Sequence, residues 1–324
     1  MRYSAAEKQE IIHLVDRSEL GVNKTLKQLG IHKSTFYKWY KVYLQRGSDG
    51  LYPARKTRQQ WNSIPEEQKQ LVVEIALDYP QLSPRELACR ITDEQRVFIS
   101  ESSVYRILKT AGLVTTPAHI LLSASNEFRN KTAFIHQMWQ TDFTYFKVLG
   151  WGWYYLSTIL DDYSRFIIHW ELCKTMRAED VERSVDYAMA KANLAKHQRP
   201  KLLSDNGSCY VASELKEYLK GVGIKQVHGK LNHPQTQGKI ERYHRSMKNV
   251  VKLDNYYCPE ELTGALEKFV HYYNYQRYHE SLDNVTPADV YLGKREKILK
   301  RREKIKRQSM AKRRELYLLD KLKI

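Results

Sequence analysis

Residues 201–207 read KLLSDNG, which places the carboxylate of Asp205 directly after a short apolar run. A buried strand followed by such a polar turn is typical of α/β sheets, in which ligand sites lie beyond the carboxyl ends of strands. Two more acidic residues stand in comparable settings, Asp142 in the stretch WQTDFT and Glu241 in the stretch QGKIER. Thirty-five residues separate Asp205 from Glu241. The three carboxylates are therefore candidates for one shared site.

Three carboxylates that meet in space can hold a pair of divalent metal ions. Hard cations such as Mg²⁺ take oxygen ligands and keep several waters, so a few protein ligands suffice. Two such ions activate an attacking oxygen on one side of a phosphodiester and stabilise the leaving oxygen on the other. An isolated Asp is more often a solvated surface carboxylate, so the hypothesis depends on Asp142, Asp205 and Glu241 acting together.

Four stretches resemble a known family: WQTDFT (139–144), LDDYSRFI (160–167), SDNG (204–207) and HPQTQGKIERYHR (233–245). They are similar to the core of the DDE transposases, in the retroviral-integrase superfamily. The match is closest to bacterial insertion-sequence transposases of the insertion-sequence-three group. It covers roughly residues 135–293, and the thirty-five-residue gap before Glu241 is a hallmark of that family.

The resemblance implies an α/β ribonuclease-H-like catalytic core, a mixed sheet flanked by helices, preceded by all-α helix-turn-helix DNA-binding domains. It implies that Asp142, Asp205 and Glu241 are the catalytic residues and the ligands of two Mg²⁺ ions, for which Mn²⁺ can substitute. A basic residue seven positions after the Glu belongs to the family pattern, and Lys248 stands there. The implied partners are double-stranded DNA, as element ends and target, and further copies of the chain in a homo-oligomer on DNA.

The patterning divides the chain into six segments. They are a helix-turn-helix domain (1–46), a basic linker (47–63), a second helix-turn-helix-like domain (64–113), a connector (114–134), the ribonuclease-H-like core (135–293) and a basic C-terminal tail (294–324).

The first domain is expected to contact DNA through its third helix, which begins near Lys33 or Ser34 and ends near Leu44. Four aromatic residues at helical spacing can pack inward, namely Phe36, Trp39, Tyr40 and Tyr43. The outward positions left for a DNA groove are Ser34, Thr35, Tyr37, Lys38 and Lys41. A three-helix bundle with no DNA role is the alternative. In the linker, Arg55, Lys56 and Arg58 could follow a phosphate backbone.

The core segment predicts three strands joined by short turns, then a helix, a strand, a helix, a strand and a helix. The predicted strands are 143–146, 153–160, 166–172, one that ends at 202–203, and 224–227. The predicted helices are 177–195, 213–221 and the one that carries Glu241, which follows a Gly/Pro/Asn-rich loop at 229–238. We expect an antiparallel meander followed by α/β crossovers.

On the last of these helices, Arg245 and Lys248 fall at i+4 and i+7 from Glu241, on the same face. Arg245 could contact DNA or form an ordinary ion pair within the helix, whereas Lys248 is expected to contact a phosphate. Asp161 and Asp162 are expected to cap a turn at a strand end and not to bind metal. The loop around His233 is expected to contact DNA, since two-metal chemistry needs no histidine.

The chain has 54 Lys and Arg against 37 Asp and Glu, a net charge of +17, which favours a polyanionic partner. Lys294 to Lys323 holds fourteen basic and four acidic residues, a net of +10, so more than half of the excess lies in the tail. We expect this tail to bind DNA without sequence preference. A helix that docks onto another subunit is the alternative.

Four widely spaced cysteines without a C-x-x-C pair favour neither a disulfide framework nor a zinc site. No apolar run reaches the eighteen residues of a membrane helix, and the first residues lack the apolar core of a signal peptide. We expect a soluble protein of the bacterial cytoplasm, associated with the nucleoid and not with a membrane.

The leading hypothesis is a transposase that binds the terminal inverted repeats of an insertion sequence, cleaves DNA and joins its strands. A domesticated DNA-binding regulator with an inactive core is the alternative. A retroviral-type integrase would carry an N-terminal zinc module with paired His and Cys, and no such pairing occurs here.

Overall fold

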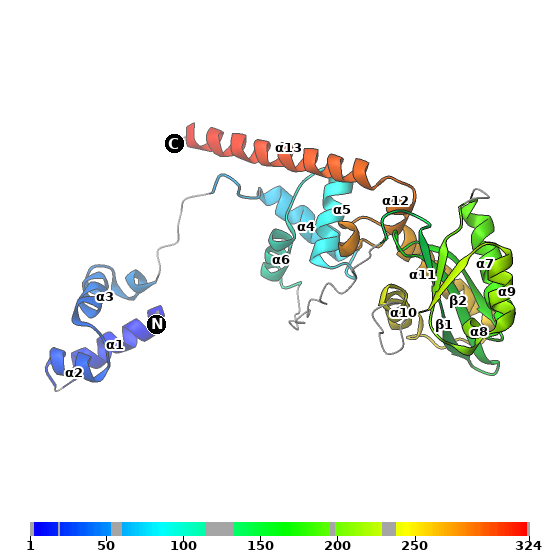
Figure 1. Ribbon diagram of the computed structural model, residues 1–324. Helices are drawn as coiled ribbons and strands as arrows, with labels where there is room; N and C mark the ends of the chain where they lie inside the picture. The colour runs from blue at the N-terminus through cyan, green and yellow to red at the C-terminus, as the bar shows by residue number, and fades with distance from the viewer. Residues whose placement is uncertain are drawn as a thin grey trace. The chain divides into compact units, whose positions relative to one another are not determined.

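The computed structural model describes residues 3–18, 20–52, 60–113, 132–194, 198–228 and 238–322 (Figure 1). The linker residues Arg55, Lys56 and Arg58 and the loop residue His233 lie outside these ranges. The chain divides into two compact units. Met1–Ser63 and Arg314–Ile324 make up the first, and Ile64–Arg313 makes up the second.

The first unit contains a small bundle of α1 (Ala5–Arg17), α2 (Val22–Gln28) and α3 (Lys33–Arg46), followed by a 3-10 helix at Gly47–Leu51. A capping box begins α1. The backbone N–H of Glu7 donates to the Ser4 hydroxyl at 3.3 Å, and the N–H of Ser4 donates to the Glu7 carboxylate at 2.6 Å. Ile12, Leu26 and Phe36 are buried between the helices.

The second unit begins with another trihelical bundle, α4 (Glu66–Asp78), α5 (Pro84–Gln95) and α6 (Glu101–Thr110). Its core contains Val72, Leu87, Ile91 and Val104, one or more from each helix. Ser83 begins α5 with a capping box, and Pro84 follows at the first helical position, where its missing N–H has no helical partner to lose.

The core of the second unit is a five-stranded mixed sheet with the order β3-β2-β1-β4-β5. The strands are β1 (Met138–Val148), β2 (Gly152–Asp161), β3 (Ile167–Cys173), β4 (Lys201–Ser204) and β5 (Lys225–His228). β1, β2 and β3 form the expected antiparallel meander, and β4 runs parallel to β1. β5 runs parallel to β4.

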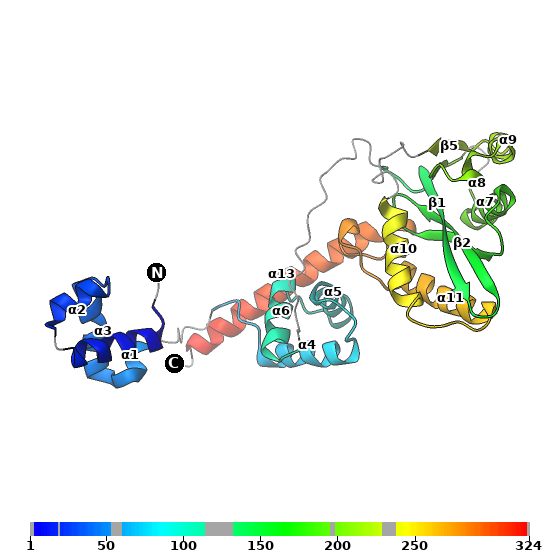
Figure 2. The same ribbon diagram turned by 90° about the horizontal axis from the view of Figure 1, so that it is seen from below.

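Helices cover both faces of this sheet (Figure 2). α7 (Ala178–Ala192), α8 (Ser208–Val211) and α9 (Ser213–Gly221) pack on the face that contains Trp139 and Leu202. The opposite face, which contains Phe146 and Leu156, is covered by α10 (Gly238–Val251) and α11 (Pro259–Tyr275). A 3-10 turn at Glu280–Leu282 and α12 (Pro287–Tyr291) follow. The element order expected from the sequence is confirmed, except that the structure adds the short helix α8 between β4 and α9.

The basic tail forms one long helix, α13 (Arg295–Leu322). Arg302 joins it to the second bundle, because the guanidinium donates to both carboxylate oxygens of Asp93 on α5, at 2.8 and 2.6 Å. The hydroxyl of Tyr278, which follows α11, donates to the same carboxylate at 3.1 Å. Further along α13, Arg313 donates to the Phe98 carbonyl at 2.7 Å. One face of the predicted tail is therefore packed within its own unit.

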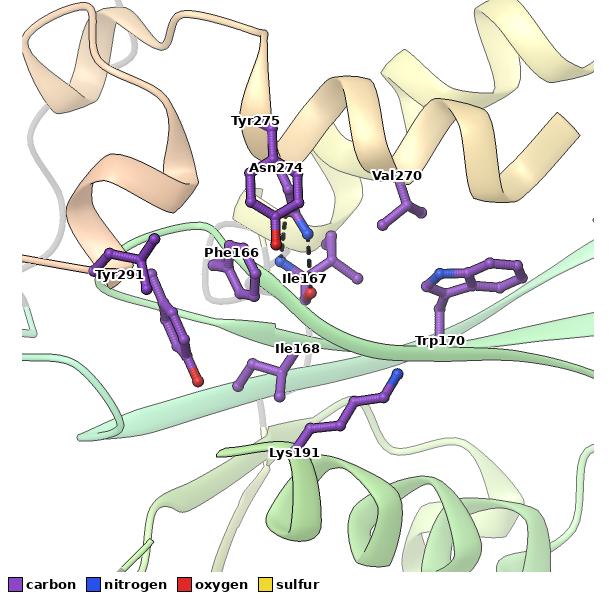
Figure 3. A pocket seen from close by; sticks show the side chains of 10 residues that line it. Phe166, Ile167, Ile168, Trp170, Lys191, Val270, Asn274, Tyr275 and Tyr291 are labelled. Carbon is purple, nitrogen blue, oxygen red and sulfur yellow. Dashed lines mark hydrogen bonds between the residues drawn. The ribbon is translucent and has the colours of Figure 1, made fainter. Parts of the chain in front are cut away.

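At the edge of the sheet, Asn274 of α11 takes the place of a neighbouring strand. Its Oδ1 accepts from the backbone N–H of Ile167 at 2.9 Å, and its Nδ2 donates to the carbonyl of Ile167 at 3.0 Å (Figure 3). The amide lies beside a cavity of about 370 Å³ whose lining includes Phe166, Trp170 and Tyr275. Asn274 thereby fixes α11 against β3.

We expect Asn274→Leu to destabilise the second unit by about 2–4 kcal/mol, because it leaves a buried N–H and a buried C=O of Ile167 without partners, each worth about 1–3 kcal/mol. Urea unfolding of the full chain, followed by circular dichroism, measures the change. Thr263→Val, which alters an exposed hydroxyl on the same helix, is the control and should stay within about 0.5 kcal/mol of the parent. Equal midpoints for Asn274→Leu and the parent would contradict the bracing role.

Candidate active site

The pairing of β1 with β4 brings the chain at Asp142 and at Asp205 to the same end of two neighbouring strands. The strands run parallel, with Trp139 opposite Leu202 and Gln140 opposite Leu203. Asp142 lies two residues beyond Gln140, and Asp205 lies two residues beyond Leu203. Neighbouring strands are roughly 4.8 Å apart, so both residues stand at the same level of the sheet. Asp142 is half-buried and Asp205 is exposed.

The residues of α8 lie close to both carboxylates. Burial, and then the charges of Asp205 and Asp142, raise the pKa of the Cys209 thiol to about 11. Burial and the same two charges also raise the pKa of Tyr210, whose hydroxyl lies 3.3 Å from that of Thr141. Cys209 and Tyr210 are both buried, so α8 forms an uncharged wall beneath this pair of acidic residues.

Helix α10 brings Glu241 to the same region. Its buried positions, Ile240, Tyr243, His244, Met247 and Val251, form one face that packs on the sheet, and Glu241 lies beside that face. A cavity of about 360 Å³ opens between β1 and α10. It is lined by Asp142, Phe143, Thr144, Glu241, His244, Arg245, Lys248 and Asn249. Two of the three predicted catalytic carboxylates therefore face one cavity.

The donor set of this cavity suits a hard divalent cation. Burial, and then the negative charge of Asp142, raise the pKa of Glu241, which shows that the two carboxylates repel one another. A cation between them would offset this repulsion, and carboxylate oxygens are the ligands that Mg²⁺ prefers.

The third carboxylate is not assembled with the other two. Asp205 lies outside the cavity lining, and its Oδ1 accepts from the backbone N–H of Gly207 at 2.8 Å. Within the ranges that the structure describes, no three acidic, His or Cys side chains are grouped closely enough to hold a metal ion. The triad as a metal centre stays a prediction.

A buried polar network, which the sequence did not reveal, fixes the start of α10 against the sheet. Asp162, at the end of β2, accepts from the Lys239 ammonium and from Gln140 Nε2, the latter at 2.7 Å. Gln140 Oε1 in turn accepts from the backbone N–H of Ile240 at 3.1 Å. Gln140 precedes Asp142 by two residues, and Lys239 precedes Glu241 by two. The network therefore sets where the two carboxylates stand relative to each other.

His244 adds a direct contact between α10 and β1. Its Nδ1 lies 3.2 Å from Oδ2 of Asp142, and the ring is buried beside the cavity. Its other nitrogen, Nε2, is also buried and has no hydrogen-bond partner in the described part of the chain. The sequence did not single out this histidine, three residues after Glu241, because it lies among the positions of α10 that form the buried face.

Arg245 and Lys248 both line the cavity with Glu241, as their helical spacing predicts. The charge of Arg245 lowers the pKa of Glu241, although burial and Asp142 outweigh it. The ion pairs of the described residues do not include a Glu241–Arg245 pair, so the intrahelical ion pair is not formed here. Both cations remain available to an anionic ligand.

Of the Asp161–Asp162 pair, only Asp161 caps the turn as expected from the sequence, whereas the Asp162 carboxylate binds the side chains of Lys239 and Gln140. Asp161 is fully buried, and its carboxylate accepts from the backbone N–H groups of Ser164 and His136, both at 2.8 Å. These bonds close the turn after β2. Both carboxylates of the pair accept hydrogen bonds from protein donors.

On α3, the predicted inner and outer faces are confirmed. Phe36 is buried, and Trp39, Tyr40 and Tyr43 pack against the same core. Ser34, Tyr37, Lys38 and Lys41 are exposed, and Thr35 is half-buried. Whether this face binds DNA is not decided by burial, so the groove contacts stay predictions.

The outer face of α13 is basic. Lys297, Lys300, Lys304 and Arg307 recur at a spacing of three or four residues and are exposed, whereas Arg302, Ile305 and Arg313 face the packed side. A row of cations along one helix face can bind phosphates without reading sequence.

Comparison with protein-family models assigns the two halves of the described architecture. Two models, both described as an integrase core domain, match residues 135–234 and 222–287. Two models described as a homeodomain-like domain match residues 2–52 and 35–108. The fold and site thus define a protein with helix-turn-helix domains and an integrase core. The fold class expected from the sequence, a ribonuclease-H-like core preceded by helix-turn-helix domains, is confirmed.

Curated relatives are insertion-sequence proteins. The chain is 30% identical over 155 residues to the putative transposase InsK for insertion sequence element IS150 of Escherichia coli, a match that covers 48% of this chain and 54% of the relative. It is 27% identical over 158 residues to the transposase for insertion sequence element IS904 of Lactococcus lactis, covering 48% and 60%. The chain is thus similar to insertion-sequence transposases, which agrees with the resemblance to the DDE transposases, and the insertion-sequence-three group fits these relatives. It spans about half the length of the InsK protein.

Solved structures that match part of the chain include integrases. The HTLV-2 integrase catalytic core domain in complex with magnesium is 20% identical, with a TM-score of 0.39 over 49% of this chain and 97% of that one. A simian T-cell lymphotropic virus intasome in complex with PP2A regulatory subunit B56 gamma is 17% identical, with a TM-score of 0.44 over 68% and 74%. Among the described residues, no helix is long and apolar enough to cross a bilayer.

We expect Lys239→Met to destabilise the chain by about 3–5 kcal/mol, because it leaves the Asp162 carboxylate, only 3% exposed, as an uncompensated buried charge. Adding Asp162→Asn should recover most of the loss, since no charge then remains to be paired. Urea unfolding of the single and double variants measures both effects. Lys216→Met, an exposed lysine on α9, is the control. A double variant no more stable than Lys239→Met alone would argue against the ion pair as the source of the loss.

Proposed function

We propose that the protein is an active transposase. It binds the terminal inverted repeats of its insertion sequence, cleaves phosphodiesters to leave 3′-hydroxyls, and joins these to target DNA. The observation that carries this proposal is the convergence of Asp142 and Glu241 on one cavity, with Asp205 at the end of the adjacent parallel strand. The expected setting is a bacterial cell, at the nucleoid, where both DNA substrates are found.

In this proposal Asp142, Asp205 and Glu241 hold two Mg²⁺ ions, and Mn²⁺ can substitute. When bound, such ions activate the attacking oxygen and stabilise the leaving oxygen. The other residues of the site position the carboxylates and the DNA. His244 and the Gln140–Asp162–Lys239 network fix β1 against α10, and Lys248 and Arg245 bind the phosphate groups that flank the scissile bond.

DNA recognition is assigned to the two helical bundles. The outer face of α3, with Ser34, Thr35, Tyr37, Lys38 and Lys41, enters a groove at the element end. The linker residues Arg55, Lys56 and Arg58 contact the phosphate backbone of the DNA near this groove. Several copies assemble on DNA, because both ends of the element must be joined to the target DNA.

Loss of any one carboxylate should abolish strand transfer and leave DNA binding intact. Asp142→Ala, Asp205→Ala and Glu241→Ala each remove one expected ligand without touching α3. Strand transfer is measured with labelled element ends and plasmid target in Mg²⁺ and in Mn²⁺, and binding by gel shift.

Glu267→Ala, an exposed carboxylate on α11, is the matched control and should join DNA like the parent. Normal joining by any of the three variants would remove that residue from the triad. A parent chain that binds element ends but never joins them, in either metal, would favour the inactive DNA-binding regulator.

Neutralising the outer face of α13 should weaken DNA binding regardless of sequence. Each phosphate neutralised on duplex DNA contributes about 0.9 to the slope of log affinity against log salt. The triple variant Lys297→Gln, Lys300→Gln and Lys304→Gln should therefore flatten the slope by about 2–3 units, for element ends and scrambled DNA alike. These lysines are exposed, so the packed face of α13 is preserved.

The matched control removes the same charge from another surface, with Lys216→Gln, Lys220→Gln and Lys225→Gln around α9. It should leave the slope within about one unit of the parent. Equal slopes for the parent and the α13 variant would exclude the outer face of α13 from DNA binding.

A further inference from the structure

An exposed aromatic pair lies next to the catalytic cavity. Tyr145 on β1 and Trp153 on β2 are each 53% exposed, and their rings meet edge to face with centroids 5.4 Å apart. β4 pairs with β1 only from Met138 to Gln140, so among the described residues no strand lies beside β1 on that side beyond this point. The rings are therefore accessible. Exposed apolar side chains that lie together mark binding surfaces more often than isolated ones do.

Two lysines approach the same ring, Lys248 on α10 and Lys252 directly after it. The ammonium of Lys248 lies 5.4 Å from the centroid of Tyr145, and that of Lys252 lies 5.5 Å from it. Neither lysine belongs to any ion pair among the residues that the structure describes. Burial, and then the charge of Lys252, lower the pKa of Lys248, so the two cations repel one another. An anion placed between them would offset that repulsion.

Lys248 connects these groups to the site of chemistry, because it also lines the cavity that contains Asp142 and Glu241. Tyr145 is three residues after Asp142 on the same strand. A ligand that reaches from the cavity to the aromatic pair would meet a carboxylate site, a phosphate site and a stacking surface in succession. A nucleic acid strand suits this arrangement, because it carries a phosphate and a flat base at each nucleotide.

We propose that Tyr145, Trp153, Lys248 and Lys252, termed the Tyr145 patch, bind an unpaired nucleotide of the DNA strand that enters the cavity. Its base stacks on the exposed aromatic rings, and its phosphate lies between the two ammonium groups. A paired base is stacked inside the duplex and presents no free face, so the patch selects DNA whose end is opened beside the scissile bond. This inference rests on the proposed function of the cavity, but its test requires no catalysis.

The test compares two labelled oligonucleotides of about twelve nucleotides, one of thymidine and one of abasic spacers, by fluorescence anisotropy with the full chain. Both carry the same charge, so the ratio of their affinities isolates base stacking. Stacking of one base is worth roughly 1–3 kcal/mol, so the parent should prefer thymidine by about 5- to 140-fold. Tyr145→Ala combined with Trp153→Ala should reduce the ratio to near one, while Tyr145→Phe should keep it.

Tyr187→Ala is the matched control, because Tyr187 on α7 is 51% exposed and does not contact the patch. It should keep the parent ratio. Lys252→Ala should weaken both oligonucleotides equally and lower the salt slope by about 0.7, the value for one phosphate on a single strand. A double aromatic variant that keeps the parent ratio would overturn the proposal.

Light scattering tests whether another copy of the chain, and not a nucleotide, occupies the Tyr145 patch. A fall in molar mass in the double aromatic variant, with the thymidine preference unchanged, would assign the rings to contact with another copy of the chain and overturn nucleotide binding. If the proposed transposase activity fails but the ratio responds as expected, the patch binds nucleotides without catalysis. If joining is normal but the ratio does not respond, only the patch is wrong.

Discussion

The geometry of the candidate active site depends on one buried ion pair, between Asp162 and Lys239. Asp162 lies at the end of β2, and Lys239 lies in the first turn of α10, so the pair joins elements that the chain connects only through a long path. Gln140 completes the junction by bonding both Asp162 and the backbone of Ile240. A buried ion pair fixes the geometry around it, because separating its partners leaves an uncompensated buried charge, which is strongly destabilising. This junction thereby fixes the distance between the carboxylates of Asp142 and Glu241.

A second long-range junction organises the rest of the second unit. Asp93 of α5 receives both Arg302 of α13 and Tyr278 after α11. Bidentate arginine–carboxylate pairs fix orientation as well as distance, because the two parallel hydrogen bonds resist rotation. The α4–α6 bundle and the integrase core are thus tied through a helix whose opposite face remains basic. Packing and charge are divided between the two sides of α13.

Local chemistry made much of the fold predictable. Ser4 and Ser83 mark helix starts through their capping boxes, and the apolar runs around Leu156 and Leu202 mark strands. The family resemblance added the candidate carboxylates. The junctions could not be predicted in this way, because Arg302 and Asp93 are 209 residues apart and Gln140 and Ile240 are 100 apart. In sequence, a lysine such as Lys239 looks the same whether it is solvated or buried against an aspartate. For the C-terminal tail, the sequence likewise predicted only the basic charge. Its packed face could not be predicted, because the residues that it contacts lie far away along the chain.

The two hydrogen bonds between Asn274 and Ile167 bear on how copies of the chain can associate. An unprotected edge strand is a template onto which another polypeptide can add its own strand. At Ile167 the outward-facing N–H and C=O of β3 are already consumed by a side chain of the same molecule. A strand added along this edge therefore could not use the backbone groups of Ile167, where β3 begins. The side chain of Asn274 shortens the template that β3 offers to another copy of the chain.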